Sequence, residues 1–445
     1  MANGSISKQL KDSLIQQALK RKLKKNEAEL AENHKTNPLT AHSAISEAFY
    51  RFDLHPAYKQ MQIMQKGAAQ LNISSPFFRV HEGISGATCS INNHQYINFS
   101  SYNYLNLSGD PRVSDAAKKA IEQYGTSVSA SRVVSGERPI HRQLETAIAD
   151  IYEVDGAVTM VSGHATNVTT IGYLFGPKDL ILHDELVHNS SLVGAQLSGA
   201  KRLSFPHNDW HSLDKTLTEQ RGNYERVLII IEGLYSMDGD YPDLARFIEI
   251  KQKHHTFLMV DEAHSFGVMG TNGQGIREHF QVEGKDVDIW MGTLSKTLAG
   301  CGGYIAGTSA LVEHLKFLAP GFLYSVGIPP QVAAPSLAAL NILKNEPERV
   351  QRLHARAQYF LSKAKAAGIN TGLSQGLGII AVITGSSVKA ARASKAMFEQ
   401  GINVQPILYP AVPEKNARLR FFISCEHTEQ QIDKTIQAYI KQLKD

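Results

Sequence analysis

The stretch GTLSKTLAGCGGY, residues 292–304, places one lysine, Lys296, among serine, threonine and glycine residues. An apolar run, DIWMGT, leads into this stretch. Upstream, VDEAHS (260–265) ends another apolar run with Asp261 and His264. Each residue alone has an ordinary explanation, Lys296 as a surface residue and Asp261 as a helix N-cap. Together, a lysine and an aspartate that each follow a buried strand indicate a shared site.

Working outward, short apolar runs alternate with helical patterns from about residue 110 to 310. The runs that predict strands are AVTMVS, DLILHD, RVLIIIEG, TFLMVDEA, DIWMGT and GGYIAG. Several are continuously apolar, which is typical of a parallel sheet covered by helices on both faces. Five of them are followed by polar groups, in chain order Ser162-Gly163-His164, His183-Asp184, Glu232-Gly233, Asp261–His264 and Thr293–Lys296. Ligands of such sheets bind beyond the carboxyl ends of the strands, so we expect these groups to converge.

The lysine and aspartate together indicate a pyridoxal phosphate (PLP) site. The lysine amine would form a Schiff base with the cofactor aldehyde. Asp261 would keep the pyridine nitrogen protonated, so that the ring can take up electrons from a substrate carbanion. The glycines after the lysine, Gly300, Gly302 and Gly303, would let the backbone approach a ligand closely.

The cofactor phosphate needs hydrogen-bond donors. Ser162-Gly163-His164 precedes a predicted helix, and a helix N-terminus is a ready anion site. A plain serine N-cap is the other interpretation. Thr293 could add a hydroxyl from the other side.

Two further side chains are candidates for the site. His188 lies in the polar run HDELVHNSS after a strand end, and its flat imidazole could stack on the pyridine ring. Arg420, in ARLRFFISC, could bind a substrate carboxylate in bidentate fashion. By pattern alone Arg418 is an equal choice, and each could be a surface strand residue.

The pattern changes after residue 310. Long helices are expected at 332–344 and 348–367, a strand pair around GIIAVITG and RLRFFIS, and a final helix at 429–443. Runs of strands and helices without alternation predict a smaller α+β domain. We expect an N-terminal helical extension and linker (1–50), an N-terminal segment (51–109), a large cofactor-binding domain (110–310) and a small C-terminal domain (311–445).

Composition narrows the function classes. Charged residues make up 20% and hydrophobic residues 42%, as in ordinary globular proteins. The N-terminus has no apolar signal-peptide core, and no run reaches the ~18 apolar residues of a membrane span. The three cysteines have no metal or disulfide spacing, so we expect no metal site and a reducing, cytoplasmic setting.

Charge is concentrated at the N-terminus. Residues 1–35 hold eight Lys/Arg and four acidic residues, which equals the whole net charge of +4. The rest is close to neutral, which argues against a nucleic-acid-binding body. The basic segment, with a short apolar stripe at helical spacing, is either a solvated extension or a docking helix for an acidic partner.

Taken together, the motifs resemble the α-oxoamine synthases, PLP enzymes of fold type I. The resemblance spans about residues 75–445 and includes INFSSYNYLNL, SGHATN, HDELVHNSS, EGLYSMDGD, DEAHSFGVMGTNGQG, GTLSK and YPAVPEKNARLRFFIS. It implies an α/β fold with a mostly parallel seven-stranded sheet and a smaller α+β C-terminal domain. It also implies a homodimer that condenses an amino acid with an acyl thioester, usually with decarboxylation, to an α-aminoketone.

The resemblance implies roles for particular residues. The catalytic set is Lys296, His188, Asp261 and His264. The cofactor-binding set is Ser162, Gly163, His164, His188, Ser236, Asp261, His264, Thr293, Lys296 and Ser325, the last reaching the phosphate of the other subunit. The substrate-binding set is Arg420 for the carboxylate, Tyr102, Asn103 and Ala411.

Departures from the family pattern bear on the acyl donor. Tyr102-Asn103 is similar to serine palmitoyltransferases and to polyketide-associated members. The stretch SGERPIHRQLE (135–145) looks most like the polyketide-associated subgroup, whose acyl donor sits on a carrier protein. We therefore expect a secondary-metabolic enzyme that joins Ser, Ala or Gly to a carrier-bound acyl group, with the basic extension helping to dock the carrier.

Three alternatives remain open. The first is a serine palmitoyltransferase-like enzyme that uses acyl-CoA to make sphingoid bases. The second is an aminotransferase, which shares the aspartate and the lysine. The third is a non-catalytic partner subunit, which would be expected to lack Lys296.

Overall fold

The computed structural model describes residues 17–18, 21–22, 24–25 and 45–444. The chain divides into two compact units, Met1–Arg79 and Val80–Asp445. In the first unit, two 3-10 turns (Glu47–Phe49 and Phe52–Leu54) precede helix α2, Pro56–Gln70. Proline at the first turn and the His55 ring, which accepts from the Ala57 N–H, fix where α2 begins. Most of the basic segment at 1–35, which we expect to help dock the carrier, lies outside the described residues.

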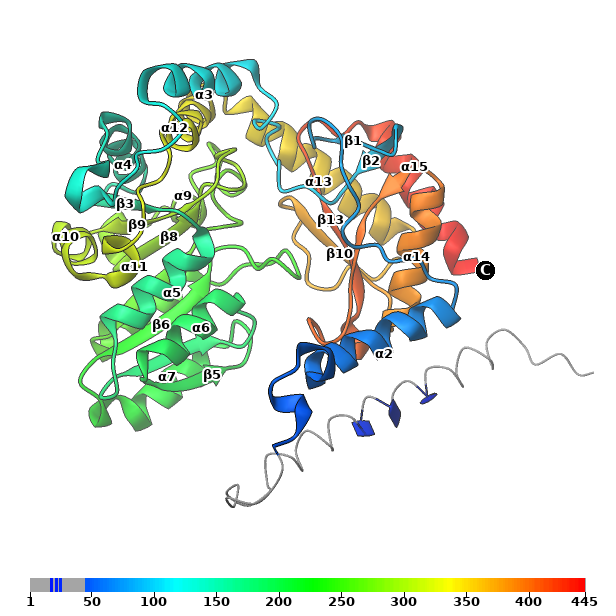
Figure 1. Ribbon diagram of the computed structural model, residues 1–445, viewed down its shortest axis with the longest axis horizontal. Helices are drawn as coiled ribbons and strands as arrows, with labels where there is room; N and C mark the ends of the chain where they lie inside the picture. The colour runs from blue at the N-terminus through cyan, green and yellow to red at the C-terminus, as the bar shows by residue number, and fades with distance from the viewer. Residues whose placement is uncertain (1–16, 19–20, 23, 26–44, 445) are drawn as a thin grey trace, which may run out of the picture. The chain divides into compact units, whose positions relative to one another are not determined.

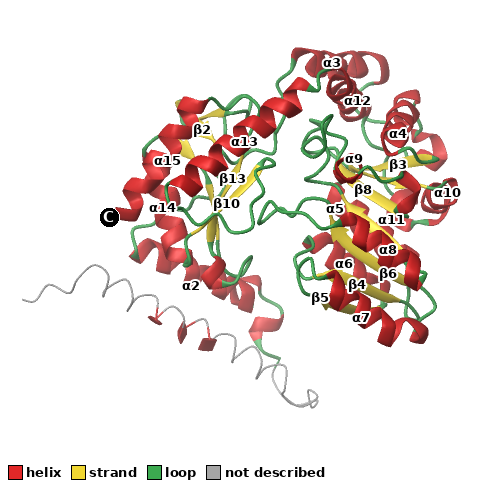
Figure 2. Cartoon of the chain, turned by 180° about the vertical axis from the view of Figure 1, so that it is seen from behind, coloured by secondary structure: helices red, strands yellow, loops and turns green. Residues whose placement is uncertain are grey.

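The second unit contains a large sheet on which the site is built (Figures 1 and 2). Its described strands are ordered β3-β9-β8-β7-β6-β4-β5. In that order their bounds are Gly156–Met160, Gly303–Gly307, Ile289–Thr293, Phe257–Asp261, Val227–Glu232, Leu180–Asp184 and Lys201–Phe205. Strand β9 is antiparallel to both neighbours, and the pairs from β8 to β5 are parallel. The expected mostly parallel seven-stranded sheet is confirmed.

Side chains of this sheet alternate between two apolar cores, because successive strand residues point to opposite faces. In β6, Ile229 and Ile231 join one buried cluster, and Leu228 and Ile230 join the other. The first cluster takes in residues of α4 (Pro139–Tyr152), α7 (Trp210–Gln220), α8 (Leu244–His254) and α12 (Pro330–Asn345). The second takes in residues of α5 (Gly163–Leu174), α6 (Asn189–Ser198), α10 (Ser309–Leu318) and α11 (Pro320–Leu323). Covering on both faces explains the continuously apolar central strands.

The remaining elements surround two small sheets. One is antiparallel, β10 (Ile379–Ile383), β13 (Arg418–Phe422) and β12 (Gln405–Ile407). The other joins β1 (Thr88–Ile91) and β2 (His94–Asn98) to β11 (Ile402–Asn403). The accompanying helices are α13 (Glu348–Ala366), α14 (Ser387–Glu399) and α15 (Glu429–Lys444). Helix α3 (Pro111–Tyr124) packs on α12, and a short α9 (Ile276–Phe280) follows the β7 loop.

Six strands expected from sequence are confirmed as β3, β4, β6, β7, β8 and β9. Strand β5 was not predicted from sequence, because KRLSF lies at the sheet edge with mostly exposed side chains and carries little apolar signal. Strands β11 and β12, which are two and three residues long, were not predicted either. The domain boundaries stay predictions, although β2, from the N-terminal segment, pairs in parallel with β11 from the C-terminal part.

Two searches of the described residues bear on function. None of their helices is long and apolar enough to cross a membrane. They also contain no cluster of three or more His, Cys, Asp or Glu side chains suited to hold a metal ion.

Candidate active site

The two expected anchor residues stand at the carboxyl ends of adjacent strands. Strand β7 ends at Asp261, and β8 ends at Thr293, three residues before Lys296. Glu232 ends β6 and pairs in register with Asp261, so two buried carboxylates lie on neighbouring strand ends. The parallel arrangement thus brings together the polar groups that follow separate apolar runs.

The loop that carries Lys296 is held by its own hydrogen bonds. The Ala299 N–H donates to the Lys296 carbonyl at 3.0 Å, and the Gly300 N–H donates to the Leu294 carbonyl at 2.8 Å. The Thr297 hydroxyl donates to the Phe266 carbonyl at 3.0 Å, which ties this loop to the one after β7. The backbone that presents the lysine is therefore fixed before any ligand binds.

The glycines after Lys296 make room for neighbouring protein atoms, and their approach to a ligand stays a prediction. A Cβ on Gly300 would lie 2.2 Å from the Ser336 hydroxyl oxygen. A Cβ on Gly303 would lie 2.5 Å from the Thr166 hydroxyl oxygen. Gly302 also has φ of +146°, which other residues rarely adopt. The glycines let β9 and the lysine loop pack closely against α5 and α12.

Lys296 has surroundings suited to a reactive amine. Burial lowers the pKa of its amine to about 8, although Asp261 and Glu232 act in the opposite direction. Its Nζ lies 5.6 Å from the centroid of the Tyr102 ring. A lysine with such a pKa has a substantial neutral fraction near pH 7 to 8, and only the neutral amine attacks an aldehyde.

Asp261 is buried and held in place by two donors. Its Oδ2 accepts from Asn167 Nδ2 at 2.8 Å, and its Oδ1 accepts from the Ala263 N–H at 3.0 Å. These two donors set the orientation of the carboxylate. The group is therefore suited to pair with a protonated ring nitrogen.

His264 lies beside Lys296 among the rings of Tyr102, Tyr104 and Phe422, which together form an aromatic box. Its Nδ1 forms a hydrogen bond with the buried Tyr104 hydroxyl at 2.8 Å. Its ring is parallel to that of Phe422, at 6.1 Å between centroids, and Tyr102 meets it edge-on at 5.8 Å. Burial, with Lys296 and Arg420 nearby, lowers the pKa of His264 well below its usual value. The imidazole is therefore neutral at ordinary pH.

His188 is anchored through both its backbone and its ring. Its N–H donates to Glu232 Oε1 at 2.5 Å, and its Nδ1 lies 2.7 Å from the Ser190 hydroxyl. It is the N-cap of α6, and the Ser190 N–H also donates to Nδ1. Burial lowers the pKa of His188 despite the nearby Asp261. The predicted stacking residue is thus a neutral imidazole with a set orientation.

The expected phosphate end lies where α5 begins. Ser162 is the N-cap, and its hydroxyl accepts from the Ala165 N–H at 3.4 Å. The first N–H groups of a helix have no partner within the helix, and here they belong to Gly163 and His164. A Cβ on Gly163 would lie 2.9 Å from the Thr293 hydroxyl oxygen, so Thr293 stands against this helix start as expected.

The structure distinguishes the two candidate arginines. Arg418 is buried, and its Nη1 donates to Asp238 Oδ1 at 2.6 Å and to the Met237 carbonyl at 2.8 Å. Arg420 Nη1 donates to the Ser236 carbonyl at 3.1 Å, but its buried Nε has no hydrogen-bond partner among the described residues. Arg420 also lies against Phe422 in the aromatic box, at 4.7 Å from the ring centroid. The free donor belongs to Arg420, which is therefore the candidate for a carboxylate.

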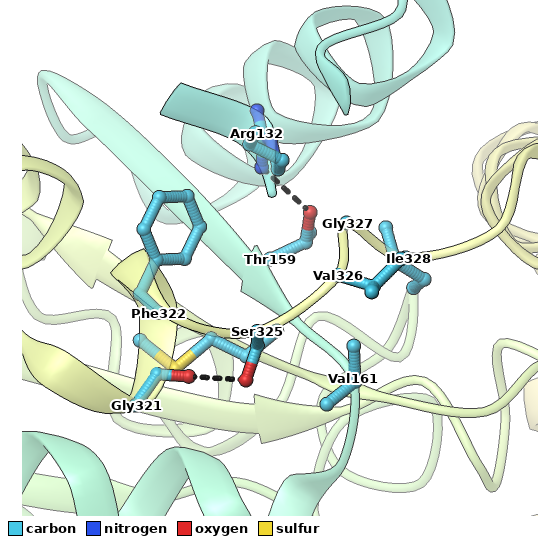
Figure 3. Close-up of a pocket in the computed structure, with 10 residues that line it drawn as sticks. Arg132, Thr159, Val161, Gly321, Phe322, Ser325, Val326, Gly327 and Ile328 are labelled. Atoms are coloured by element: carbon cyan, nitrogen blue, oxygen red, sulfur yellow. Dashed lines mark hydrogen bonds between the residues drawn. The ribbon is translucent and has the colours of Figure 1, made fainter. Parts of the chain in front are cut away.

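Ser325 lines a small pocket that is shown in Figure 3. Its hydroxyl donates to the Gly321 carbonyl at 2.7 Å. Arg132 lines the same pocket, but its guanidinium is already paired with Glu137 and Glu145. The role of Ser325 at the site of the other subunit stays a prediction.

The predicted substrate residues have different surroundings. Tyr102 faces the site and is 41% exposed. Asn103 is buried, and its amide is engaged by Ser85, which precedes β1, and by Ser108 in the loop before α3. Ala411 is exposed in the loop between β12 and β13. Roles for Asn103 and Ala411 stay predictions.

The residues present fit PLP. A buried amine of lowered pKa suits the aldehyde, a buried carboxylate suits the ring nitrogen, and a helix N-terminus suits the phosphate. The unpartnered Arg420 Nε supplies a donor for a carboxylate next to them.

Comparison with known proteins agrees with a PLP site. Residues 94–438 match the family of aminotransferases class I and II. The chain is 40% identical over 351 residues to an 8-amino-7-oxononanoate synthase of Symbiobacterium thermophilum, covering 79% of this chain and 89% of the relative. It is 39% identical over 385 residues to that of Fervidobacterium nodosum, covering 86% and 96%.

A high-resolution structure of SPT (serine palmitoyltransferase) with PLP has a TM-score of 0.83 at 28% identity, covering 88% of this chain and 98% of that one. The chain belongs to the α-oxoamine synthases. It is a PLP-dependent C-acyltransferase of the fold-type I class.

Three residues beside the anchors were not given a role from sequence. Asn167 binds Asp261, Glu232 holds the His188 backbone, and Tyr104 binds His264. All three lie inside the quoted motifs SGHATN, EGLYSMDGD and INFSSYNYLNL, so the motifs marked them without saying what they contact.

Proposed function

We propose that this chain condenses a small amino acid with an acyl thioester and releases CO₂, giving an α-aminoketone. A carbon–carbon bond forms between the amino acid α-carbon and the thioester carbonyl, and the carbon–sulfur bond breaks. The thiol leaves with a proton, and loss of the carboxylate as CO₂ is followed by protonation of the α-carbon. The supporting observation is the gathering of the Lys296 amine, the Asp261 carboxylate and the free Arg420 donor.

Each residue of the site would have a separate role in this reaction. Arg420 would bind the amino acid carboxylate through its free Nε. The neutral Lys296 amine would take the α-proton and later return one. PLP, when bound, supplies the ring that takes up electrons from the α-carbon. Asp261 would hold the ring nitrogen protonated, while the bond between Tyr104 and His264 keeps that imidazole in one orientation.

The amino acid is proposed from product chemistry. The compound 8-amino-7-oxononanoate carries its amine and ketone on neighbouring carbons and ends in a methyl group beside the amine. Those terminal atoms correspond to alanine without its carboxylate. Since relatives at 40% identity are named for this product, we propose alanine, serine or glycine as the acceptor.

The donor is proposed to be an acyl group on a carrier protein, in secondary metabolism. Support comes from SGERPIHRQLE, which looks like the polyketide-associated members, and from the basic charge of residues 1–35. Carrier proteins are acidic, so a basic segment would favour their encounter. The structure describes little of that segment.

A second candidate is a serine palmitoyltransferase-like enzyme that uses acyl-CoA. Tyr102 is similar to the residue at this place in those enzymes. Its ring meets the rings of His264 and Phe422 edge-on. The solved SPT structure has the same fold. A non-catalytic partner subunit is disfavoured because Lys296 and Asp261 are both present.

We further propose a homodimer in which Ser325 serves the partner's site. Tyr324 and Val326 flank Ser325 and are 86% and 52% exposed, and Val134 is 78% exposed. Ser131 and Val326 form a β-bridge, so the apolar side chains belong to adjoining segments. Exposed apolar groups of this kind mark protein interfaces.

The test is a product assay with PLP-loaded, full-length protein. Ala, Ser and Gly would each be combined with acyl-CoA or an acyl carrier protein, and free thiol, CO₂ and aminoketone measured. We expect thiol release only when both substrates are present, and its loss in Lys296→Ala. Lys178→Ala, which removes an exposed lysine paired with Glu225, is the matched control.

Two other outcomes would reject the condensation, and a third would change only its acyl donor. Amino-group transfer to a keto acid without thiol release would indicate an aminotransferase. If the protein mixed with PLP shows no visible absorption band that borohydride can remove, the chain is a non-catalytic subunit. Turnover with acyl-CoA but not with carrier-bound substrate would leave the condensation standing and favour the second candidate.

A further inference from the structure

Asn167 links two helices to the end of β7. It lies in the second turn of α5 and is 1% exposed. Its Nδ2 donates to Asp261 Oδ2 at 2.8 Å and to the Ser190 hydroxyl at 2.9 Å. The amide orientation follows from Asp261, since turning the amide oxygen towards that carboxylate would set two acceptors against each other.

Ser190 passes this arrangement on to His188. Because the Ser190 oxygen accepts from Asn167, its own hydrogen is free to donate to His188 Nδ1, 2.7 Å away. The Ser190 N–H points at the same nitrogen, at 3.3 Å. Two donors on Nδ1 leave that nitrogen without a proton, so the neutral ring carries its hydrogen on Nε2.

Glu232 completes the anchoring from the neighbouring strand. Its Oε1 accepts the His188 N–H, while Asn167 reaches the ring of His188 through Ser190. His188 is thus tied to the strand ends of both β6 and β7. The imidazole ring cannot flip without breaking its hydrogen bond with the Ser190 hydroxyl. The same hydroxyl accepts from Asn167, which is the partner of Asp261.

We propose that Asn167 is a positioning residue that couples the Asp261 carboxylate to the His188 imidazole through Ser190. The inference rests on the proposed function, in which Asp261 pairs with the PLP ring nitrogen and His188 stacks on the ring. The carboxylate that protonates the ring and the imidazole that covers it are then set by one chain of hydrogen bonds. A displacement of the Asp261 carboxylate weakens the positioning of the His188 imidazole, and the reverse holds as well.

A double-mutant cycle tests this coupling. Asn167→Ala, Ser190→Ala and the double variant would be made in the full chain, and the PLP dissociation constant of each apo-protein measured. Asn167→Ala removes a donor to a charged group, so we expect binding to weaken by about ten- to a hundredfold. Because Asn167 acts on His188 through Ser190, the two residues are links of one hydrogen-bond chain, and the double variant should bind PLP no more than about twofold more weakly than Asn167→Ala.

Two additional measurements separate positioning from simple packing. The pH midpoint of the visible band of the bound cofactor should shift in Asn167→Ala, because the Asp261 carboxylate loses one of its two donors. Asn167→Asp, of nearly the same volume, should shift it as well, since a second carboxylate disfavours ionisation of Asp261. Thr170→Val is the control, because Thr170 is buried one turn further along α5 and its hydroxyl has no partner in the described residues.

The outcomes are distinguishable. If the effects of Asn167→Ala and Ser190→Ala multiply in the double variant, the two residues act separately and the coupling is wrong. Unchanged pH midpoints in both Asn167 variants would likewise overturn it, whatever happens to stability. If the wild-type protein shows no lysine-bound chromophore, the proposed function itself fails, and the cycle is not what decides it.

Discussion

Lys296 owes its reactivity to burial, which lowers the pKa of its amine to about 8. The amine of a solvated lysine is almost fully protonated at pH 8, and a protonated amine cannot attack an aldehyde. In this chain the neutral fraction rises with pH around 8 and is nearly complete about two pH units above it. The chemistry of the site is therefore poised close to ordinary pH.

This leads to a prediction for PLP capture. The rate at which apo-protein acquires the visible band should increase with pH, with a midpoint near 8, and then level off. Stopped-flow absorbance between pH 6 and 10 would measure it, with free lysine and PLP as the reference reaction. A rate that still rises steeply above pH 9.5 would mean that the amine is solvated.

Arg420 is expected to affect one substrate only. Arg420→Ala should raise the amino acid KM by at least tenfold and leave the thioester KM within about twofold, because a charge-assisted bond to the carboxylate is lost. Steady-state kinetics with each substrate varied in turn would show it. Equal changes in both KM values would place the carboxylate elsewhere. Arg420→Lys should recover little, because lysine lacks the bidentate geometry.

At the scale of elements, strand β13 is anchored by a buried ion pair. Arg418, in β13, bonds Asp238 and the Met237 carbonyl in the loop after β6. Two residues on, Arg420 bonds the Ser236 carbonyl of the same loop. One strand thus carries a structural arginine and a candidate substrate arginine, and the first sets the position of the second.

We expect Arg418→Ala to destabilise the fold. Removing one partner of a buried pair leaves Asp238 uncompensated, which costs about 3–5 kcal/mol in the free energy of unfolding. Denaturant titration would measure it, and the amino acid KM should rise as well. Lys178→Ala is the matched control, because its pair with Glu225 is solvent-exposed and should contribute little to stability. Similar losses in both variants would contradict this interpretation.

At the scale of the whole molecule, the proposed homodimer would bury the exposed apolar segment around Ser325. Tyr324→Glu should shift the sedimentation velocity of the protein from a two-chain to a one-chain species, because a charge opposes burial of this segment. PLP binding should weaken in parallel, since the partner's Ser325 would no longer reach the phosphate. Leu373→Glu, which charges another exposed apolar residue, should change neither property. A single-chain wild-type protein would reject the dimer.

Local patterns were sufficient for much of this protein. Apolar runs of strand length, ended by polar groups, predicted six strands of the large sheet, because burial on both faces leaves a continuous signal in sequence. The lysine and aspartate that follow two of those strands indicated the cofactor, since the order of strand ends in a parallel sheet is set by its topology. The quoted motifs were specific enough to indicate the family.

Other features depended on contacts between distant segments. Arg418 and Arg420 are equivalent by pattern, and only the bond between Arg418 and Asp238, 180 residues apart, shows which one is free. Asn167 and Asp261 are 94 residues apart, and nothing local marks their hydrogen bond. The sequence by itself predicted six strands of the large sheet and the cofactor from local periodicity and residue chemistry, and its motifs indicated the family by resemblance. Only the tertiary structure decided which polar atoms are satisfied and which remain free for a ligand, because that depends on how close side chains of separate elements approach.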